Sequence, residues 1–170
     1  FIRDVVERMR TEWRSSRDGR YRESPKTCAL FEHEYAIDIR PETWQALRGN
    51  VVTCLRNFFT LPLLAEIRAT SAEHWSIELW SRSFEFEGTP MWIAPDFGFW
   101  NGEDRLVLVD WKTGGAAPDA TAFQLGCYAL YANEVLGVEP GRVDLVEANL
   151  REPEVTPHRW SDARLEEIKE

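Results

Sequence analysis

The stretch PDFGFWNGEDRLVLVDWKTG, residues 95–114, places one acid directly after a proline and ends an apolar run with a second acid and a lysine. In an extended strand, successive side chains point to opposite faces. One face of the run therefore carries Leu106, Leu108, Asp110 and Lys112, and the other carries Val107, Val109 and Trp111. Both faces are apolar until the charges begin, which predicts a central strand that delivers Asp110 and Lys112 together at its C-terminal end.

The hairpin before this strand decides whether Asp96 joins the two charges. A two-residue Asn101-Gly102 turn would place Asp96 opposite Val107, whereas a loop of about five residues centred on position 103 would place it opposite Asp110. Pro95 cannot donate a ladder hydrogen bond and favours a strand start, bulge or edge at this point. Only the longer loop brings the two carboxylates to one site.

Two carboxylates at such close range repel each other, and a divalent cation relieves the repulsion. Oxygen ligands suit Mg²⁺ or Mn²⁺, and a magnesium site uses one or two carboxylates together with waters and substrate phosphate oxygens. Lys112 cannot ligate as an ammonium, but it can orient or deprotonate an attacking water and offset charge in the transition state. Asp96, Asp110 and Lys112 therefore indicate metal-assisted phosphoryl chemistry.

The rest of the chain predicts an α/β fold around this hairpin. An amphipathic helix is expected over 2–16 and a second over 41–61, ended by Pro62. The expected later elements are a three-strand antiparallel meander within 75–112, a helix over 118–136 ended by Gly137, a strand at 142–150, an extended partner at 154–160 and a last helix at 161–170 capped by Ser161.

A chain of 170 residues with 44% hydrophobic residues fits one domain. We expect an extension over 1–40, a core over 41–160 and a C-terminal helix over 161–170, together forming part of a longer polypeptide. The three cysteines, Cys28, Cys54 and Cys127, give neither a disulfide framework nor the four thiolates of an iron–sulfur cluster. They favour a cytoplasmic protein, and no apolar run is long enough to cross a bilayer.

Charge is unevenly distributed along the chain, whose net charge is -9. Residues 1–26 hold 8 Lys and Arg against 5 Asp and Glu, and the rest hold 12 against 24. An acidic body argues against broad electrostatic coating of DNA but suits a site that attracts a divalent cation. The first helix carries an arginine stripe, which is either a solvated face or a phosphate contact: Arg3, Arg10, Arg14 and Arg17.

The motif formed by PD, thirteen residues and then DWK resembles the PD-(D/E)XK nuclease superfamily. VDWKTG followed by QLGCYALY is similar to the RecB-type branch, in which a D-x-K-T-G strand leads into a Q-x-x-x-Y helix. The resemblance implies a restriction-endonuclease-like core with a central mixed sheet. It further implies that Asp96, Asp110 and the carbonyl of Trp111 bind Mg²⁺ or Mn²⁺ and that Lys112 is catalytic. Gln124 and Tyr128 would face the site or the DNA from one side of the helix.

The chain departs from this branch at one ligand. Relatives commonly carry a histidine in a segment resembling G-x-x-x-H-x-x-L, and GNVVTCLRNF offers Thr53 and Cys54 instead. Glu78 is our candidate substitute ligand, and His33, which is flanked by acids in FEHEY, is a weaker one. An iron–sulfur cluster, found in some relatives, is not expected.

These features predict a metal-dependent DNA nuclease of the RecB-like exonuclease type. Its expected partners are DNA and either further domains of a longer chain or a helicase- or defence-type complex, without a membrane. The alternative is a nuclease fold kept for DNA binding or assembly. A third class, a hydrolase of small phosphate esters, is disfavoured because the sequence contains no glycine-rich loop that would bind the phosphate.

Four tryptophans of the predicted sheet fit either core packing or stacking on single-stranded bases: Trp80, Trp92, Trp100 and Trp111.

Overall fold

The computed structural model describes residues 1–24, 26–76, 82–102, 104–115 and 118–169. The chain forms two compact units, Phe1–Arg56 and Asn57–Glu170, whose boundary falls inside a long helix. Within the described ranges, no helix is long and apolar enough to cross a membrane.

The N-terminal unit is helical. Its elements are α1 (Ile2–Arg17), η1 (Arg20–Arg22), α2 (Phe31–Glu34) and the first part of α3 (Pro41–Thr60). Both long helices confirm the predictions. Pro41 opens α3 at a position where a missing N–H breaks no helical hydrogen bond. Buried Ser16 ties α2 to α1, because its Oγ accepts the Leu30 N–H at 2.8 Å.

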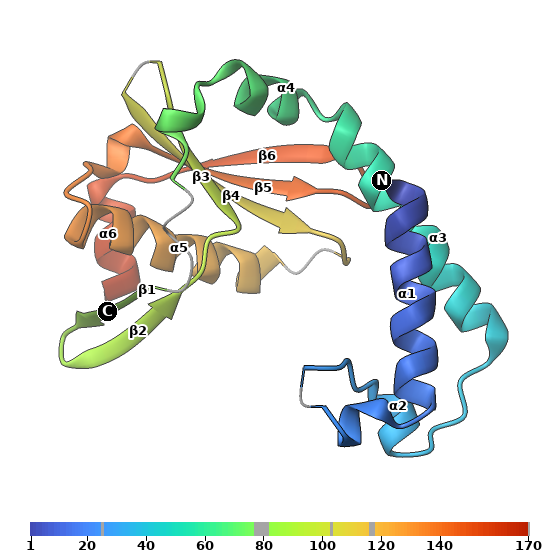
Figure 1. Cartoon of the computed structure of the whole chain (residues 1–170). Coiled ribbons are helices and arrows are strands. Elements are labelled where there is room, and N and C mark those ends of the chain that lie inside the picture. Colours follow the sequence, from blue (N-terminus) through green and yellow to red (C-terminus); the bar gives the residue numbers. More distant parts are fainter. Residues whose placement is uncertain (25, 77–81, 103, 116–117, 170) are drawn as a thin grey trace. The chain divides into compact units, whose positions relative to one another are not determined.

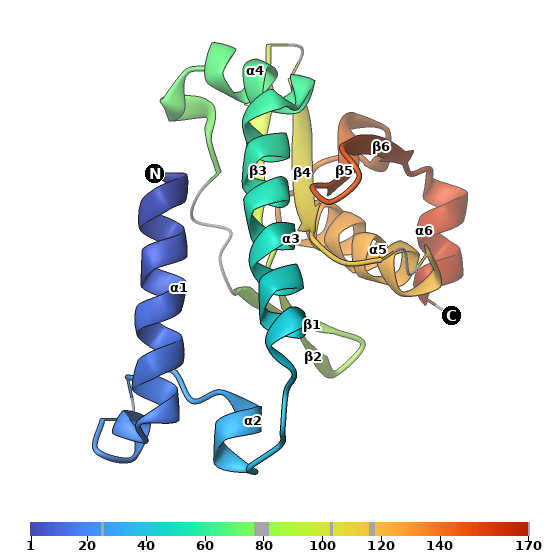
Figure 2. The ribbon, with the colours of Figure 1, turned by 90° about the vertical axis from the view of Figure 1, so that its right-hand side faces the viewer.

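The C-terminal unit is an α/β structure built on a mixed sheet (Figure 1). Its sheet has the order β3 (Phe97–Asn101), β4 (Arg105–Lys112), β5 (Val143–Asn149), β6 (Glu154–Arg159). The pair β4·β5 is parallel and the outer pairs are antiparallel. Parallel neighbours need a crossover, which α5 (Pro118–Glu134) supplies. The helix runs along one face of the sheet, as Figures 1 and 2 show from two directions.

Smaller elements complete this unit. They are α4 (Pro62–Ala69), η2 (Ala72–His74), β1 (Arg82–Phe86), β2 (Thr89–Ile93), η4 (Pro140–Arg142) and α6 (Asp162–Lys169). The predicted ends of two helices are confirmed. Gly137 follows α5 with a φ of 66°, a conformation that glycine adopts without strain. Ser161 caps α6 by accepting the Arg164 N–H at 3.3 Å.

The predicted three-strand meander is wrong in its pairing. Strands β1 and β2 form a separate two-stranded sheet, and β3 pairs with β4 in the four-stranded one. The break falls at the segment 94–96, where Pro95 cannot donate to a ladder. The outer edge of β3 is met instead by Trp75, which bridges Phe99, and by Ser76, whose N–H bonds the Gly98 carbonyl at 2.8 Å. Continuation of that contact through 77–81 lies outside the described residues.

The predicted alternation along residues 105–112 is confirmed by burial. Leu106 and Leu108 are fully buried and belong to one core cluster with Leu125 and Leu130 of α5. On the other face of the sheet, Trp111 meets Phe58 edge-on, with ring centroids 5.2 Å apart. A strand covered on both faces fixes which way each of its side chains points. The position of Asp110 at the end of the α5-facing row is therefore set by the core.

Candidate active site

The pairing of β3 with β4 settles the register of the two predicted acids. Phe97 lies opposite Val109 and Asn101 lies opposite Arg105, and extending this register by one residue beyond β3 sets Asp96 opposite Asp110. This is the longer of the two loops considered from the sequence. It is closed by Asn101, whose carbonyl accepts the Asp104 N–H at 3.2 Å while its side-chain oxygen accepts the Arg105 N–H at 3.2 Å. The left-handed backbone of Asp104, with a φ of 54°, completes the turn.

Asp96 is held against β4 by a backbone contact. Its Oδ2 accepts a hydrogen bond from the N–H of Trp111 at 2.7 Å. Although the residue as a whole is exposed, its carboxyl group is partly desolvated, and this is the main cause that raises the pKa of Asp96. The neighbouring Asp110 carboxylate raises that pKa further, whereas the Trp111 hydrogen bond and Lys112 oppose the rise. The two acids are therefore close enough to repel each other.

Four further predicted residues form one connected network. Asp110, 3% exposed, makes an ion pair through Oδ2 with Lys112 Nζ at 2.6 Å. Lys112 Nζ also donates to Gln124 Oε1 at 2.7 Å, and Gln124 Nε2 donates to Asp110 Oδ1 at 2.8 Å. The second N–H of this amide reaches Tyr128 Oη at 2.7 Å. Gln124 thus bridges acid, lysine and phenol, which orients all three.

Tyr128 anchors the network to the segment between the two sheets. Its hydroxyl donates to the carbonyl of Ala94 at 3.1 Å and lies 3.5 Å from Asp110 Oδ1. Burial is the main cause that raises the pKa of Tyr128 to about 12, so the phenol stays protonated and remains a donor at neutral pH. Sequence reasoning missed the Ala94 carbonyl. Its position next to Pro95 gives no sequence signal for such a contact, because any residue type supplies a carbonyl.

The donor set is compatible with a hard divalent cation. Asp110 Oδ2 is buried and accepts no hydrogen bond from the described residues; its close neighbour is the Lys112 ammonium. A cation that binds this oxygen would compete with that ammonium. The part of the chain that the structure describes holds no cluster of three His, Cys, Asp or Glu. Two carboxylates and the Trp111 carbonyl still match Mg²⁺, which keeps several waters and uses phosphate oxygens.

One acid beside the site was not predicted. Glu147 of β5 is the register partner of Asp110, and paired residues of parallel strands point to the same face. Its Oε2 lies 3.6 Å from Nε2 of His158 on β6. A partial signal existed, because the mostly apolar strand VDLVEAN carries two acids, Asp144 and Glu147. The sequence alone could not assign Glu147 to this site, since that requires the order of strands in the sheet.

Of the two proposed substitute ligands, the structure describes only His33. Glu78 lies outside the described residues. His33 belongs to the N-terminal unit, where its Nδ1 lies 2.9 Å from Ser16 Oγ and its ring meets Trp13 edge-on, so packing accounts for it. In that same unit Cys54 is buried and Thr53 is exposed.

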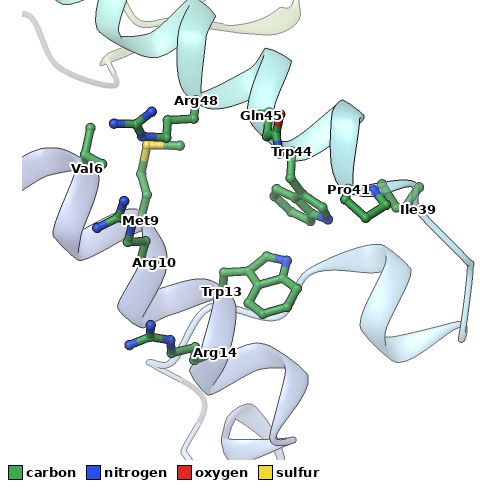
Figure 3. Close-up of a pocket in the computed structure, with 10 residues that line it drawn as sticks. All are labelled: Val6, Met9, Arg10, Trp13, Arg14, Ile39, Pro41, Trp44, Gln45 and Arg48. Atoms are coloured by element: carbon green, nitrogen blue, oxygen red, sulfur yellow. The ribbon is translucent and has the colours of Figure 1, made fainter.

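The predicted arginine stripe lies partly on a cavity of the N-terminal unit, about 470 Å³ in volume. The cavity lies between α1 and α3, and Figure 3 labels its lining: Val6, Met9, Arg10, Trp13, Arg14, Ile39, Pro41, Trp44, Gln45 and Arg48. Two indoles meet there, those of Trp13 and Trp44, with centroids 5.8 Å apart. Arg10 and Arg14 of the stripe contribute to the lining, and Arg48 joins them from α3. Arg17 instead pairs with Asp18 at 3.1 Å.

Fold and site together define an α/β protein with a buried acid–lysine–amide–phenol network at the end of a central strand. Comparison of the chain with family models, with curated proteins and with solved structures finds no significant match. The chemistry of the site is therefore the guide to function.

Proposed function

We propose that this chain is a DNA nuclease domain that depends on Mg²⁺ or Mn²⁺, with the restriction-endonuclease-like core of the PD-(D/E)XK superfamily and closest in motif to its RecB-type branch. The observation that carries the proposal is the convergence of Asp96, Asp110 and Lys112 with the Gln124–Tyr128 pair. These residues come from two neighbouring strand ends and a helix, and the chemistry of each one suits phosphoryl transfer. A buried Asp–Lys pair is also costly to maintain for stability alone.

The order of elements supports the same superfamily. Strand β4 ends in Asp110 and Lys112, α5 follows and carries Gln124 and Tyr128, and β5 returns parallel to β4. In such a crossover the C-terminal end of the first strand and the first turns of the helix lie at the same edge of the sheet. Ligand sites of α/β proteins occur at this edge.

The proposed reaction is hydrolysis of a phosphodiester. A bond forms between a water oxygen and phosphorus, the ester bond to the leaving sugar oxygen breaks, and the proton lost by the water is balanced by one gained by the leaving oxygen. A divalent cation held by Asp96, Asp110 and the Trp111 carbonyl would supply charge neutralisation and activation of the water. Lys112, whose side chain is partly buried beside Asp110, offsets the negative charge that builds on the phosphoryl oxygens.

Gln124 and Tyr128 act as positioning residues in this scheme. The amide fixes the separation of Asp110 and Lys112 by bonding to both. The phenol holds the amide and is itself held by Ala94. Such preorganisation matters because a small displacement of a reacting group costs a large factor in rate.

The test compares Asp110→Asn and Lys112→Ala with the control Asp144→Asn. Asp144 is another acid of the same sheet, bound to Arg105 and placed by its register with Val107 on the opposite face. We expect Mg²⁺-dependent cleavage of labelled single-stranded and duplex DNA to fall by about 10²- to 10³-fold or more in the site variants and to persist in the control. Circular dichroism confirms that each variant is folded.

Wild-type cleavage rates in both site variants would overturn the assignment. A wild-type protein that binds DNA but cleaves none with either metal would identify the alternative, a nuclease fold used for binding or assembly. The missing helix histidine is the feature that favours this alternative.

A further inference from the structure

Two large exposed aromatic rings line a cavity that borders the candidate active site. Trp92 of β2 is 72% exposed and Phe123 of α5 is 63% exposed. Both line one cavity of about 320 Å³ in the C-terminal unit, together with Ile93, Ala94, Gln124, Cys127 and Tyr128. The cavity therefore shares two residues, Gln124 and Tyr128, with the network that holds Asp110 and Lys112.

Packing does not explain these two rings. Ile93, next to Trp92, is 3% exposed and belongs to the core cluster, so strand alternation turns the indole outward. On α5, Phe123 lies two positions before Leu125, which is fully buried. Exposed large aromatics that share one concave site are typical of ligand contacts. Of the two roles considered for the sheet tryptophans, core packing therefore does not apply to Trp92, whereas Trp100 packs against the core and Trp111 against Phe58. Trp80 lies outside the described residues.

We propose that Trp92 and Phe123 form a stacking platform for an unpaired base of a single-stranded nucleic acid whose phosphate occupies the candidate active site. This inference rests on the proposed function and extends it to a substrate class. Both faces of a base in a duplex are covered by its neighbours, whereas an unpaired base offers a free face to an aromatic ring. Gln124 and Tyr128 at the cavity wall add polar groups that suit a heterocycle rather than an apolar peptide side chain.

The charge of this unit favours the same occupant. Residues 57–170 contain 9 Lys and Arg against 20 Asp and Glu, so long-range electrostatics repel a polyanion. A strand that binds here must gain affinity from contacts that do not depend on net charge. Stacking on exposed rings is such a contact, and it tolerates any base sequence because every base has a π-face.

The experiment measures equilibrium binding of a fluorescent oligothymidylate 20-mer and of a 20-base-pair blunt duplex to the full 170-residue chain, with chelator present to prevent metal-dependent cleavage. We expect the wild type to prefer the single strand, and Trp92→Ala or Phe123→Ala to weaken that binding roughly tenfold each. Trp92→Phe keeps a ring and should retain most of the affinity. Phe31→Ala is the matched control, because Phe31 is 66% exposed and does not line the cavity.

The outcomes separate this inference from the proposed function. Loss of single-strand binding in the two alanine variants supports the platform even if no cleavage is found, in which case only the nuclease proposal fails. Unchanged binding in both variants overturns the platform and leaves the nuclease proposal standing. The platform is also overturned if the wild type does not bind the single strand, or if Phe31→Ala loses as much single-strand affinity as the two cavity variants.

Discussion

The two units of this protein are stabilised in different ways. In the described part of the N-terminal unit only Val6, Ser16 and Cys54 are buried, and the helices are joined by ring contacts and by hydrogen bonds to Ser16. The C-terminal unit buries strand β4 between two covered faces and places its charges at the strand end. A dense core can hold a buried acid–lysine pair in fixed geometry, and a thinly packed helical unit cannot.

Charge separates the two units as well. Residues 1–56 contain 11 Lys and Arg against 9 Asp and Glu, whereas residues 57–170 contain 9 against 20. The unit with the candidate catalytic residues is thus the one that repels DNA at long range. Any electrostatic attraction has to come from local clusters, such as Arg10, Arg14 and Arg48. A substitution or a bound metal in one unit should therefore affect stability and DNA binding differently from a change in the other unit.

The largest effect is expected from the core of the C-terminal unit. Leu108→Ala should reduce its stability by about 2–5 kcal/mol, because Leu108 is fully buried and its removal leaves a cavity. Hydrogen exchange should show faster opening of β4 and β5 with little change in α1. Val6→Ala, in the N-terminal unit, should show the reverse pattern and a smaller change. Equal destabilisation of both units by Leu108→Ala would show that they unfold together.

Metal binding should act on the C-terminal unit alone. Because Asp96 and Asp110 repel each other, a divalent cation should stabilise this unit by mass action, by about 2.7 kcal/mol at a concentration one hundred times its Kd. Thermal melting with Mn²⁺ or with chelator measures the shift, and Asp96→Asn should remove most of it. Asp144→Asn is the control that should keep the shift. No change in melting at millimolar metal would contradict the proposed cation site.

The arginines of the N-terminal cavity should contribute a smaller, salt-dependent effect. Replacing Arg10, Arg14 and Arg48 by Gln should flatten the salt dependence of DNA binding by roughly 0.9 in log–log slope for each duplex phosphate that these side chains neutralise in the wild type. Arg8→Gln is the control, because Arg8 is on the same helix but does not line the cavity. If the triple variant and the control have the same slope as the wild type, Arg10, Arg14 and Arg48 make no phosphate contact.

The smallest effect is expected for an ion pair away from the site. Arg105 donates two hydrogen bonds to Asp144, at 2.7 and 2.6 Å, and these lower the pKa of Asp144. A carboxyl whose pKa is lower in the folded state stabilises the protein above its unfolded pKa of about 3.9, and loses that contribution as pH falls. Asp144→Asn should therefore cost about 1–2 kcal/mol at pH 7. Denaturant titrations should show the two proteins converging between about pH 5 and pH 2; a constant difference would contradict this.

Most of the secondary structure could be predicted from the sequence, and so could five of the residues that the structure brings together: Asp96, Asp110, Lys112, Gln124 and Tyr128. Alternation over residues 105–112, the prolines at 41 and 62 and the glycine at 137 are local signals, because each acts through the backbone or the face of its own segment. The chemistry of Asp110 and Lys112 at a strand end is equally local. For the same reason, the predicted spacing of Gln124 and Tyr128 on one helix face is confirmed by their hydrogen bond.

How these segments pair and pack against one another depends on the folded chain as a whole. Two loop lengths fitted residues 95–112, and the observed register selects the one that places Asp96 opposite Asp110. The separate β1·β2 sheet, the outward turn of Trp92 and the position of Glu147 beside Asp110 could not be predicted. Strand order and burial depend on contacts between residues distant in sequence, and local propensity carries no information about which distant surface will cover a given face.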